Sequence, residues 1–214
     1  MEVTAEARTP PSATARLVLA HGAGAGIDHP FMQGLCDALA RHGVATTAFA
    51  FPYMEAGRRR IDARPVLYAA WAAAIARARR GRLPWFAGGK SMGGRVLAEA
   101  LADGRCPAHP RGVLFFGYPL HPAGRPDTAR ARPLARVPVP MWFAQGTRDR
   151  LADLDLVRGV VAGLRPRATL YVVEGADHGF RVRKRDGRSF EAVLDAMAGA
   201  AAAWIRSHLG GDEP

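Results

Sequence analysis

Short apolar runs alternate with longer segments of helical periodicity along most of this chain. The short runs predict strands, and segments in which apolar residues recur every third or fourth position predict helices. The predicted strands are residues 16–20, 44–51, 83–87, 112–116, 139–144 and 168–173, and the predicted helices are residues 31–41, 65–80, 91–102, 154–164 and 189–209. This alternation indicates an α/β fold: a three-layer α/β/α sandwich with a mostly parallel sheet of about six to seven strands.

The length of the chain fits one domain. Its 214 residues can bury a single sizeable core, and we expect this domain to span residues 15–210. Residues 1–14 are rich in Ala, Thr and Pro and predict a flexible N-terminal tail with room for a short edge strand. This tail lacks the features of a secretory signal. The sequence contains no uncharged apolar run long enough for a membrane-spanning helix, so we predict none. We therefore expect a cytoplasmic protein without a membrane partner, in which Cys36 and Cys106 are reduced.

The net charge of +11 comes almost entirely from arginine, since lysine occurs only at Lys90 and Lys184. Abundant arginine and alanine are typical of proteins from GC-rich bacterial genomes. The arginines are scattered, whereas a nucleic-acid-binding protein concentrates them on one face with interleaved aromatic residues. We therefore expect no nucleic-acid partner, while an attraction of anionic substrates stays open.

The motif G-x-S-x-G occurs at residues 89–93, between a predicted strand and a predicted helix. A serine on such a sharp turn is forced into strained backbone angles, and its neighbours two positions away must be small to avoid collision across the turn. This context is typical of a nucleophile elbow. The sequence therefore predicts Ser91 as a nucleophile.

A serine hydroxyl needs a general base to take its proton, and the base needs a carboxylate that fixes its tautomer. On this type of turn the partners follow in the order acid, then His, each on a loop after a strand. Asp149 follows the predicted strand at 139–144, and His178 follows the one at 168–173. We predict these two residues as acid and base. Asp153 is the alternative acid, although its place at the start of the next helix fits a capping role.

The reaction also needs donors for the oxyanion of a tetrahedral intermediate. One is the backbone N–H of Met92, directly after the nucleophile. The second is predicted to be the N–H of Ala23, in the loop after the first strand. Small residues in this loop let the backbone approach a substrate carbonyl closely. His21, Gly22 and Gly24 of the same loop are therefore candidates for substrate contact.

Competing motifs fail on spacing. The G-K-S at residues 89–91 resembles the end of a phosphate-binding loop, but Pro84 stands where that pattern needs glycine. The G-A-G at residues 22–24 follows a strand, as in a dinucleotide-binding motif, but Ile27 stands where the third small residue is required. No His, Cys or carboxylate cluster has zinc spacing. We therefore predict no cofactor and no catalytic metal.

Together, Ser91, Asp149, His178 and the HGAG loop resemble the α/β-hydrolase superfamily. Within it, the chain is similar to the small lidless bacterial group near dienelactone hydrolases, and especially to testis-expressed-protein-like or NSL-complex-subunit-like hydrolases. The segments HGAGAG, FPY, GGKSMGGR, GYPLHP and GADHGF, spread over residues 21–180, carry this resemblance. It implies a serine hydrolase fold with a Ser-His-Asp triad. Dienelactone hydrolases have cysteine at the position of Ser91, which argues against dienelactone as the substrate.

The FPY and GYPL segments follow the second and fourth predicted strands, at the edge where open α/β sheets bind ligands. Two roles are therefore open for the apolar residues of these segments: they line a pocket, or they pack in the core at the strand ends. The residues are Phe51, Tyr53, Tyr118 and Leu120. Lys90, next to the nucleophile, either steers an anionic substrate or pairs with a nearby carboxylate.

The sequence predicts a serine hydrolase of the carboxylesterase or thioesterase type, which cleaves a small-molecule ester or thioester through an acyl-enzyme. A non-catalytic interaction module on the same fold is one alternative. A peptidase or acyltransferase with the same triad is another. Acyl transfer requires a site that excludes water, and the Pro- and Arg-rich segment 118–137 offers little material for a lid. The acyl group, the leaving group and the oligomeric state stay open.

Overall fold

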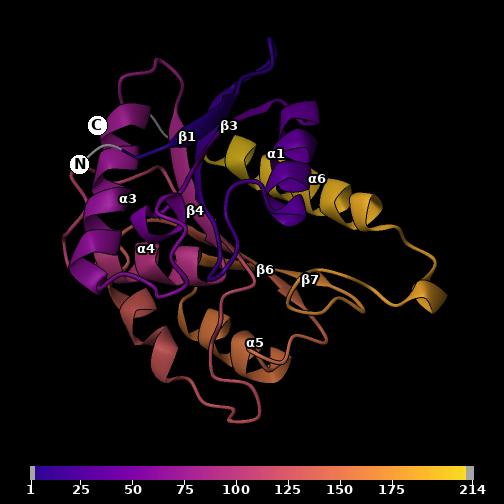
Figure 1. Ribbon diagram of the computed structural model, residues 1–214. Coiled ribbons are helices and arrows are strands. Elements are labelled where there is room, and N and C mark those ends of the chain that lie inside the picture. Colours follow the sequence, from indigo (N-terminus) through magenta and orange to yellow (C-terminus); the bar gives the residue numbers. More distant parts are fainter. Residues whose placement is uncertain (1–2, 211–214) are drawn as a thin grey trace.

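The computed structural model describes residues 3–210 of the chain (Figure 1). Their seven strands form one sheet in the order β1-β3-β2-β4-β5-β6-β7. The strands are β1 (Ala5–Arg8), β2 (Ala15–Ala20), β3 (Val44–Phe49), β4 (Trp85–Lys90), β5 (Val113–Phe116), β6 (Met141–Gly146) and β7 (Ala168–Val173). Within this described sheet, β1 is antiparallel to β3 and the other neighbours are parallel. The predicted α/β sandwich with a mostly parallel sheet is confirmed.

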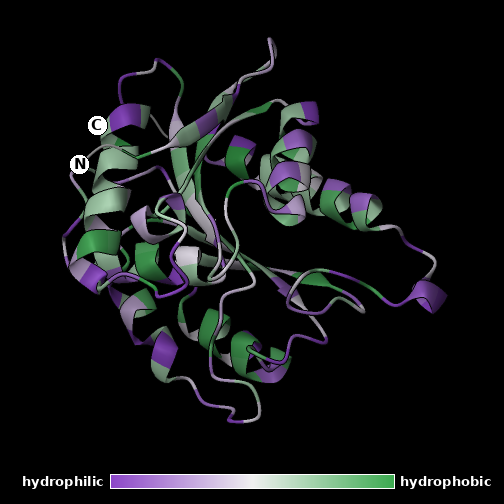
Figure 2. Cartoon of the chain, in the orientation of Figure 1, coloured by the Kyte–Doolittle hydropathy of each residue, from purple (hydrophilic) through white to green (hydrophobic). Residues whose placement is uncertain are grey.

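Helices cover both faces of the sheet (Figure 1). They are α1 (Pro30–Arg41), α2 (Pro52–Glu55), α3 (Arg64–Ala78), α4 (Met92–Ala102), α5 (Leu154–Gly163) and α6 (Phe190–Ser207), with the short 3-10 helices η1 (Ala129–Arg136) and η2 (Lys184–Asp186). Helices α1 and α6 share one apolar core with the sheet, and α3, α4 and α5 share the other. Figure 2 shows hydrophobic and hydrophilic residues on different sides of these helices, as expected when one side is buried.

The N-terminal segment, predicted as a flexible tail with room for a short edge strand, contains such a strand. Residues 5–8 form the edge strand β1, which pairs with β3 from Ala5 opposite Phe49 to Arg8 opposite Thr46. Val3 is also buried. The four residues AEAR carry no β-branched or aromatic side chain, so the strand has no local signal and depends on its partner. Residues 1 and 2 of the predicted tail lie outside the described residues.

The segment 118–137 is not an extended loop throughout, because it contains η1, which packs on α4. Leu134 of η1 is buried, and the Tyr118 hydroxyl donates a hydrogen bond to the Arg130 carbonyl at 2.7 Å. These contacts hold the segment against the domain, and it forms no separate lid. None of the helices between residues 3 and 210 is long and apolar enough to span a membrane.

The loops that follow β4, β6 and β7 lie at the same edge of the sheet. Strands β4 to β7 are parallel neighbours, so their carboxyl ends lie together. Ser91 directly follows β4, Asp149 follows β6 and His178 follows β7. The candidate nucleophile, acid and base therefore meet at this edge although they are far apart in sequence.

Candidate active site

Ser91 occupies a strained turn between β4 and α4, with φ 50° and ψ −115°. A positive φ is unfavourable for a residue with a side chain, so the surrounding structure must enforce it. The flanking glycines make the turn possible. A Cβ at Gly89 would lie 2.4 Å from the backbone nitrogen of Gly94, and one at Gly93 would lie 2.6 Å from the carbonyl oxygen of His21. The motif residues are thus fixed by close backbone packing.

The side chains of Ser91, His178 and Asp149 form one continuous hydrogen-bonded chain. His178 Nε2 lies 2.9 Å from Ser91 Oγ, and His178 Nδ1 lies 2.7 Å from Asp149 Oδ2. Because an ionised carboxylate only accepts hydrogen bonds, Nδ1 carries the proton, which leaves the Nε2 lone pair free to accept the serine proton. The imidazole is 27% exposed, while the Asp149 side chain is 1% exposed. This arrangement leaves the base accessible and buries the acid.

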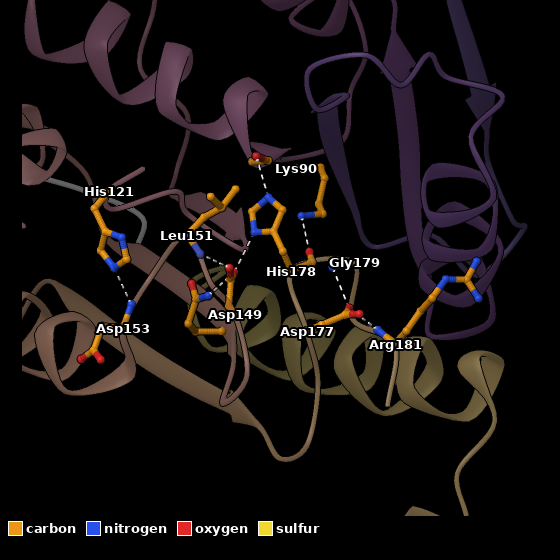
Figure 3. A network of polar contacts seen from close by, with 11 residues as sticks. Lys90, His121, Asp149, Leu151, Asp153, Asp177, His178, Gly179 and Arg181 are labelled. Carbon is orange, nitrogen blue, oxygen red and sulfur yellow. Dashed lines mark hydrogen bonds and ion pairs between the residues drawn. The ribbon is translucent and has the colours of Figure 1, made fainter. Parts of the chain in front are cut away.

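Two further donors fix the position of the Asp149 carboxylate. The Gln145 amide donates to Oδ2 at 2.6 Å. The Leu151 backbone N–H donates to Oδ1 at 2.8 Å (Figure 3). Asp153, the alternative acid, instead accepts hydrogen bonds from the N–H groups of Asp155 and Leu156 at the start of α5. This geometry favours Asp149 as the partner of His178 and gives Asp153 the capping role.

The loop that carries His178 is closed by its own hydrogen bonds. Asp177 Oδ1 accepts from the N–H groups of Gly179 and Arg181, both at 2.9 Å (Figure 3). The Phe180 N–H donates to the Asp177 carbonyl at 2.9 Å, and Phe180 has a φ of 61°. The fully buried Phe180 ring stacks on Phe31 of α1, with 5.5 Å between centroids. The loop is therefore a rigid support for the imidazole.

A model of the alpha/beta hydrolase domain family matches residues 13–206. The chain belongs to this α/β-hydrolase family. It is similar in structure to an alpha-beta serine hydrolase homologue from Coxiella burnetii, with a TM-score of 0.73 and 16% identity over 93% of this chain and 91% of that one. The predicted superfamily is thereby confirmed.

Two further solved structures share this fold. A dienelactone hydrolase from Anabaena variabilis has a TM-score of 0.70 and 19% identity, over 97% of this chain and 92% of that one. XC6422 from Xanthomonas campestris, a serine hydrolase without lid, has a TM-score of 0.70 and 18% identity, over 99% of this chain and 91% of that one. At such identities the similarity shows the fold, which agrees with the lidless architecture described above.

The two predicted oxyanion donors flank the serine of this hydrolase fold. Met92 is the first residue of α4, where helix geometry leaves the backbone N–H without an intrahelical acceptor. Ala23 lines the same cavity as Ser91. The loop approaches closely, since a Cβ on Gly22 would lie 3.5 Å from Ser91 Cβ. The positive end of the α4 dipole also favours negative charge at this point.

His21 lies behind this loop and is fully buried. Its Nε2 accepts a hydrogen bond from the Phe51 N–H at 3.0 Å, so Nδ1 carries the proton and donates to the Gly22 carbonyl at 2.8 Å. Burial lowers the pKa of His21, which favours this neutral form. His21 was a candidate for substrate contact, but the structure gives it a supporting role: it ties the predicted oxyanion loop to the FPY segment.

A cavity of about 310 Å³ opens beside Ser91. Of the predicted residues, it is lined by Gly22, Ala23, Lys90, Ser91 and His178. Residues that the sequence reasoning missed complete the lining: Ala25, His29, Phe31, Met32, Leu151 and Gly179. Several of them lie in the loop after β2 and the first turn of α1, so the rule that ligands bind at the carboxyl edge of the sheet could have pointed to them.

The other candidates lie away from this cavity. Phe51, Tyr53, Tyr118 and Leu120 are buried in the core on the α3 and α4 face. Of the two alternatives for these residues, the structure favours core packing, because all four are buried in that core and none lines the cavity. Gly24 also lies outside the lining and has a φ of 69°, which favours glycine.

Within residues 3–210, a metal site, a reactive thiol or a second cavity with the residues of a reaction centre would be an alternative to the site at Ser91. No group of three or more His, Cys, Asp or Glu side chains in this part of the chain could hold a metal ion. Cys36 and Cys106 are free thiols, and burial raises the pKa of both. A larger depression of about 770 Å³ lies between β1 and α3 and contains none of the three hydrogen-bonded residues. The hydrogen-bonded chain at Ser91 is therefore the candidate reaction centre.

Proposed function

We propose that this protein is a serine hydrolase that cleaves a carboxylic ester or thioester through an acyl-enzyme on Ser91. The observation that carries the proposal is the pair of hydrogen bonds at His178, 2.9 Å to Ser91 Oγ and 2.7 Å to Asp149 Oδ2. These contacts join a nucleophile, a base and an orienting carboxylate in the geometry that acyl transfer requires.

In the proposed reaction, Ser91 Oγ attacks the carbonyl carbon of the substrate while His178 Nε2 accepts the hydroxyl proton. The carbonyl electron pair moves onto oxygen, where the N–H groups of Met92 and Ala23 stabilise the negative charge. Collapse of this intermediate breaks the C–O or C–S bond, and the His178 imidazolium protonates the leaving alcohol or thiol. Water then gives a proton to His178 and attacks the acyl carbon. The bond from this carbon to Ser91 Oγ breaks, His178 returns the proton to Oγ, and the acid and the free serine result.

The size of the cavity supports a small substrate. Its volume of about 310 Å³ is at the lower end of the range for ligand sites, roughly 300–1,000 Å³. Phe31, Met32 and Leu151 supply apolar lining, which suits a short acyl chain. We therefore expect turnover of short-chain esters or thioesters and a decline as the acyl chain outgrows the cavity.

The first test is reaction of the purified protein with a fluorophosphonate, followed by mass spectrometry of the modified peptide. We expect stoichiometric labelling of Ser91, no labelling of Ser91→Ala, and a large loss of labelling in His178→Ala. His109→Ala is the matched control, because His109 is an exposed histidine away from the site. It should label at the wild-type rate.

The second test is turnover of paired esters and thioesters with the same acyl groups. Labelling of Ser91 together with turnover of this series supports the proposal and defines the leaving group. A folded protein that neither reacts with the phosphonate nor turns over any member of the series would overturn it. The fold would then serve as an interaction module without catalysis.

A further inference from the structure

Lys90 is the last residue of β4 and directly precedes the nucleophile. Its side chain turns toward the loop after β7, where Nζ donates a hydrogen bond to the His178 carbonyl oxygen at 2.7 Å (Figure 3). This one side chain therefore connects the strand of Ser91 to the backbone of His178, although the two bonded residues are 88 positions apart in sequence.

The ammonium of Lys90 lies in a mostly buried and largely apolar setting. Nζ is 5.5 Å from the ring centroid of Phe31 and 5.4 Å from that of Phe180. A Cβ on Gly117 would lie 3.1 Å from Nζ, so the backbone of the loop after β5 also lies close to the ammonium. The residue as a whole is 9% exposed. The ring faces and the His178 carbonyl thus replace most of the water around the cation.

No carboxylate among the described residues lies within ion-pair distance of Lys90 Nζ. Attraction by Asp149 and Asp177 acts over a longer distance and offsets only part of the cost of burial. The sequence left two roles open for Lys90, pairing with a carboxylate or steering an anionic substrate. Within residues 3–210, the structure does not show the carboxylate pair. A buried cation without a counter-ion costs stability, and proteins keep such groups mainly where function depends on them.

The hydrogen bond from Lys90 to the His178 carbonyl makes a connection that the other contacts of the His178 loop do not make. Hydrogen bonds from Asp177 shape the loop internally, and Asp149 holds the imidazole from the β6 side. Neither set bonds the loop to β4, the strand that ends directly before Ser91. A hydrogen bond from the neighbouring residue of the nucleophile does so directly, and catalytic geometry has to be held within about 0.5 Å.

We propose that Lys90 is a positioning residue, which holds the backbone of His178 so that Nε2 stays within reach of Ser91 Oγ. This inference rests on the proposed serine hydrolase function. Lys90 does not take part in bond making or proton transfer. Its hydrogen bond sets the distance between the nucleophile and its base.

The test compares Lys90→Met with the wild type in phosphonate labelling and in ester turnover. Methionine keeps a long apolar side chain against Phe31 and Phe180 but has no donor for the His178 carbonyl. A misplacement of about 1 Å at a reaction centre lowers rates on the order of 100-fold. We expect losses in labelling rate and kcat that approach this size, with KM little changed. Lys184→Met, which removes the other lysine from an exposed position, is the matched control and should keep full activity.

A second readout separates positioning from general support of the fold. We expect the downfield proton resonance of His178 Nδ1–H to shift or broaden in Lys90→Met while circular dichroism stays unchanged. If Lys90→Met fails to fold, Lys90→Arg tests the positioning role instead, because arginine keeps a donor for the His178 carbonyl. It should then retain labelling within about tenfold of wild type, well above the loss expected from misplacement.

The outcomes separate the two proposals. A folded wild type that is neither labelled at Ser91 nor active on the ester and thioester series refutes the hydrolase function and, with it, the role of Lys90. Labelled wild type with equal rates and spectra in Lys90→Met refutes the positioning role alone, as does a folded Lys90→Arg that loses all labelling. Loss of rate and a disturbed His178 resonance in a folded Lys90→Met support both.

Discussion

The buried ammonium of Lys90 makes the stability of this protein depend on pH in a direction that can be worked out. Burial lowers the pKa of Lys90 from 10.5 to about 8 in the folded chain. Between these two values the unfolded chain binds a proton that the folded chain has released. Stability therefore rises with pH across this window, because it increases wherever the unfolded state binds more protons.

The size of the effect follows from the same two values. Each pH unit between them corresponds to about 1.4 kcal/mol, so the gap between 10.5 and about 8 corresponds to about 3 kcal/mol. Below pH 8 the fold bears this cost in full, because Lys90 is protonated in both states. Above pH 10.5 the cost has disappeared. Domains are stable by only about 5–15 kcal/mol, so the change is large enough to measure.

The assay is urea unfolding of wild type and Lys90→Met at pH 7.5, 9 and 10.5. Other groups titrate in both proteins, so the difference between their free energies of unfolding isolates Lys90. We expect wild type to gain about 3 kcal/mol relative to the variant between the lowest and highest pH. Lys184→Met provides the reference curve for loss of one exposed lysine.

A difference that does not change with pH would show that the ammonium is well solvated and that its burial costs the fold no stability. A difference that falls with pH would show that the charge stabilises the fold, which reverses the sign of the effect. The expected rise, combined with the loss of labelling in Lys90→Met, would show that the fold gives up stability to position the base.

Three further substitutions test the site and its supports. Gly93→Ala places a Cβ 2.7 Å from the Ala20 carbonyl oxygen, so we expect about 1–3 kcal/mol lower stability in urea unfolding and slower phosphonate labelling. An unchanged labelling rate would contradict the close packing of the elbow. Asp153→Ala removes the N-cap of α5, so we expect the free energy of unfolding to fall by about 1 kcal/mol while phosphonate labelling persists. Loss of labelling would indicate that Asp153 is the acid instead. Asp149→Asn should lower turnover on the order of 10⁴-fold with the fold intact, because the amide no longer fixes the tautomer of His178, and near-normal kcat would exclude the proposed role.

The sequence alone was sufficient for the features that depend on short-range sterics and periodicity. The alternation of apolar runs and helical patterns predicted the sandwich, since burial of a strand or of one helix side leaves a regular trace in the chain. The glycines beside Ser91 predicted the sharp turn, because only glycine avoids collision with the backbone there. The order of Ser91, Asp149 and His178, each after a predicted strand, predicted which residues meet at one edge. That they catalyse a reaction stays a prediction.

Tertiary structure decided the features without a local trace. Strand β1 has no strand-forming composition and exists because β3 offers it a free edge. His21 and Phe51 were placed correctly at the carboxyl edge, but the direction of their side chains depends on packing against each other. The role of Lys90 was undecidable from its neighbours in sequence. Its partner is a backbone carbonyl, which every residue carries, and only folding brings the carbonyl of His178 to Lys90.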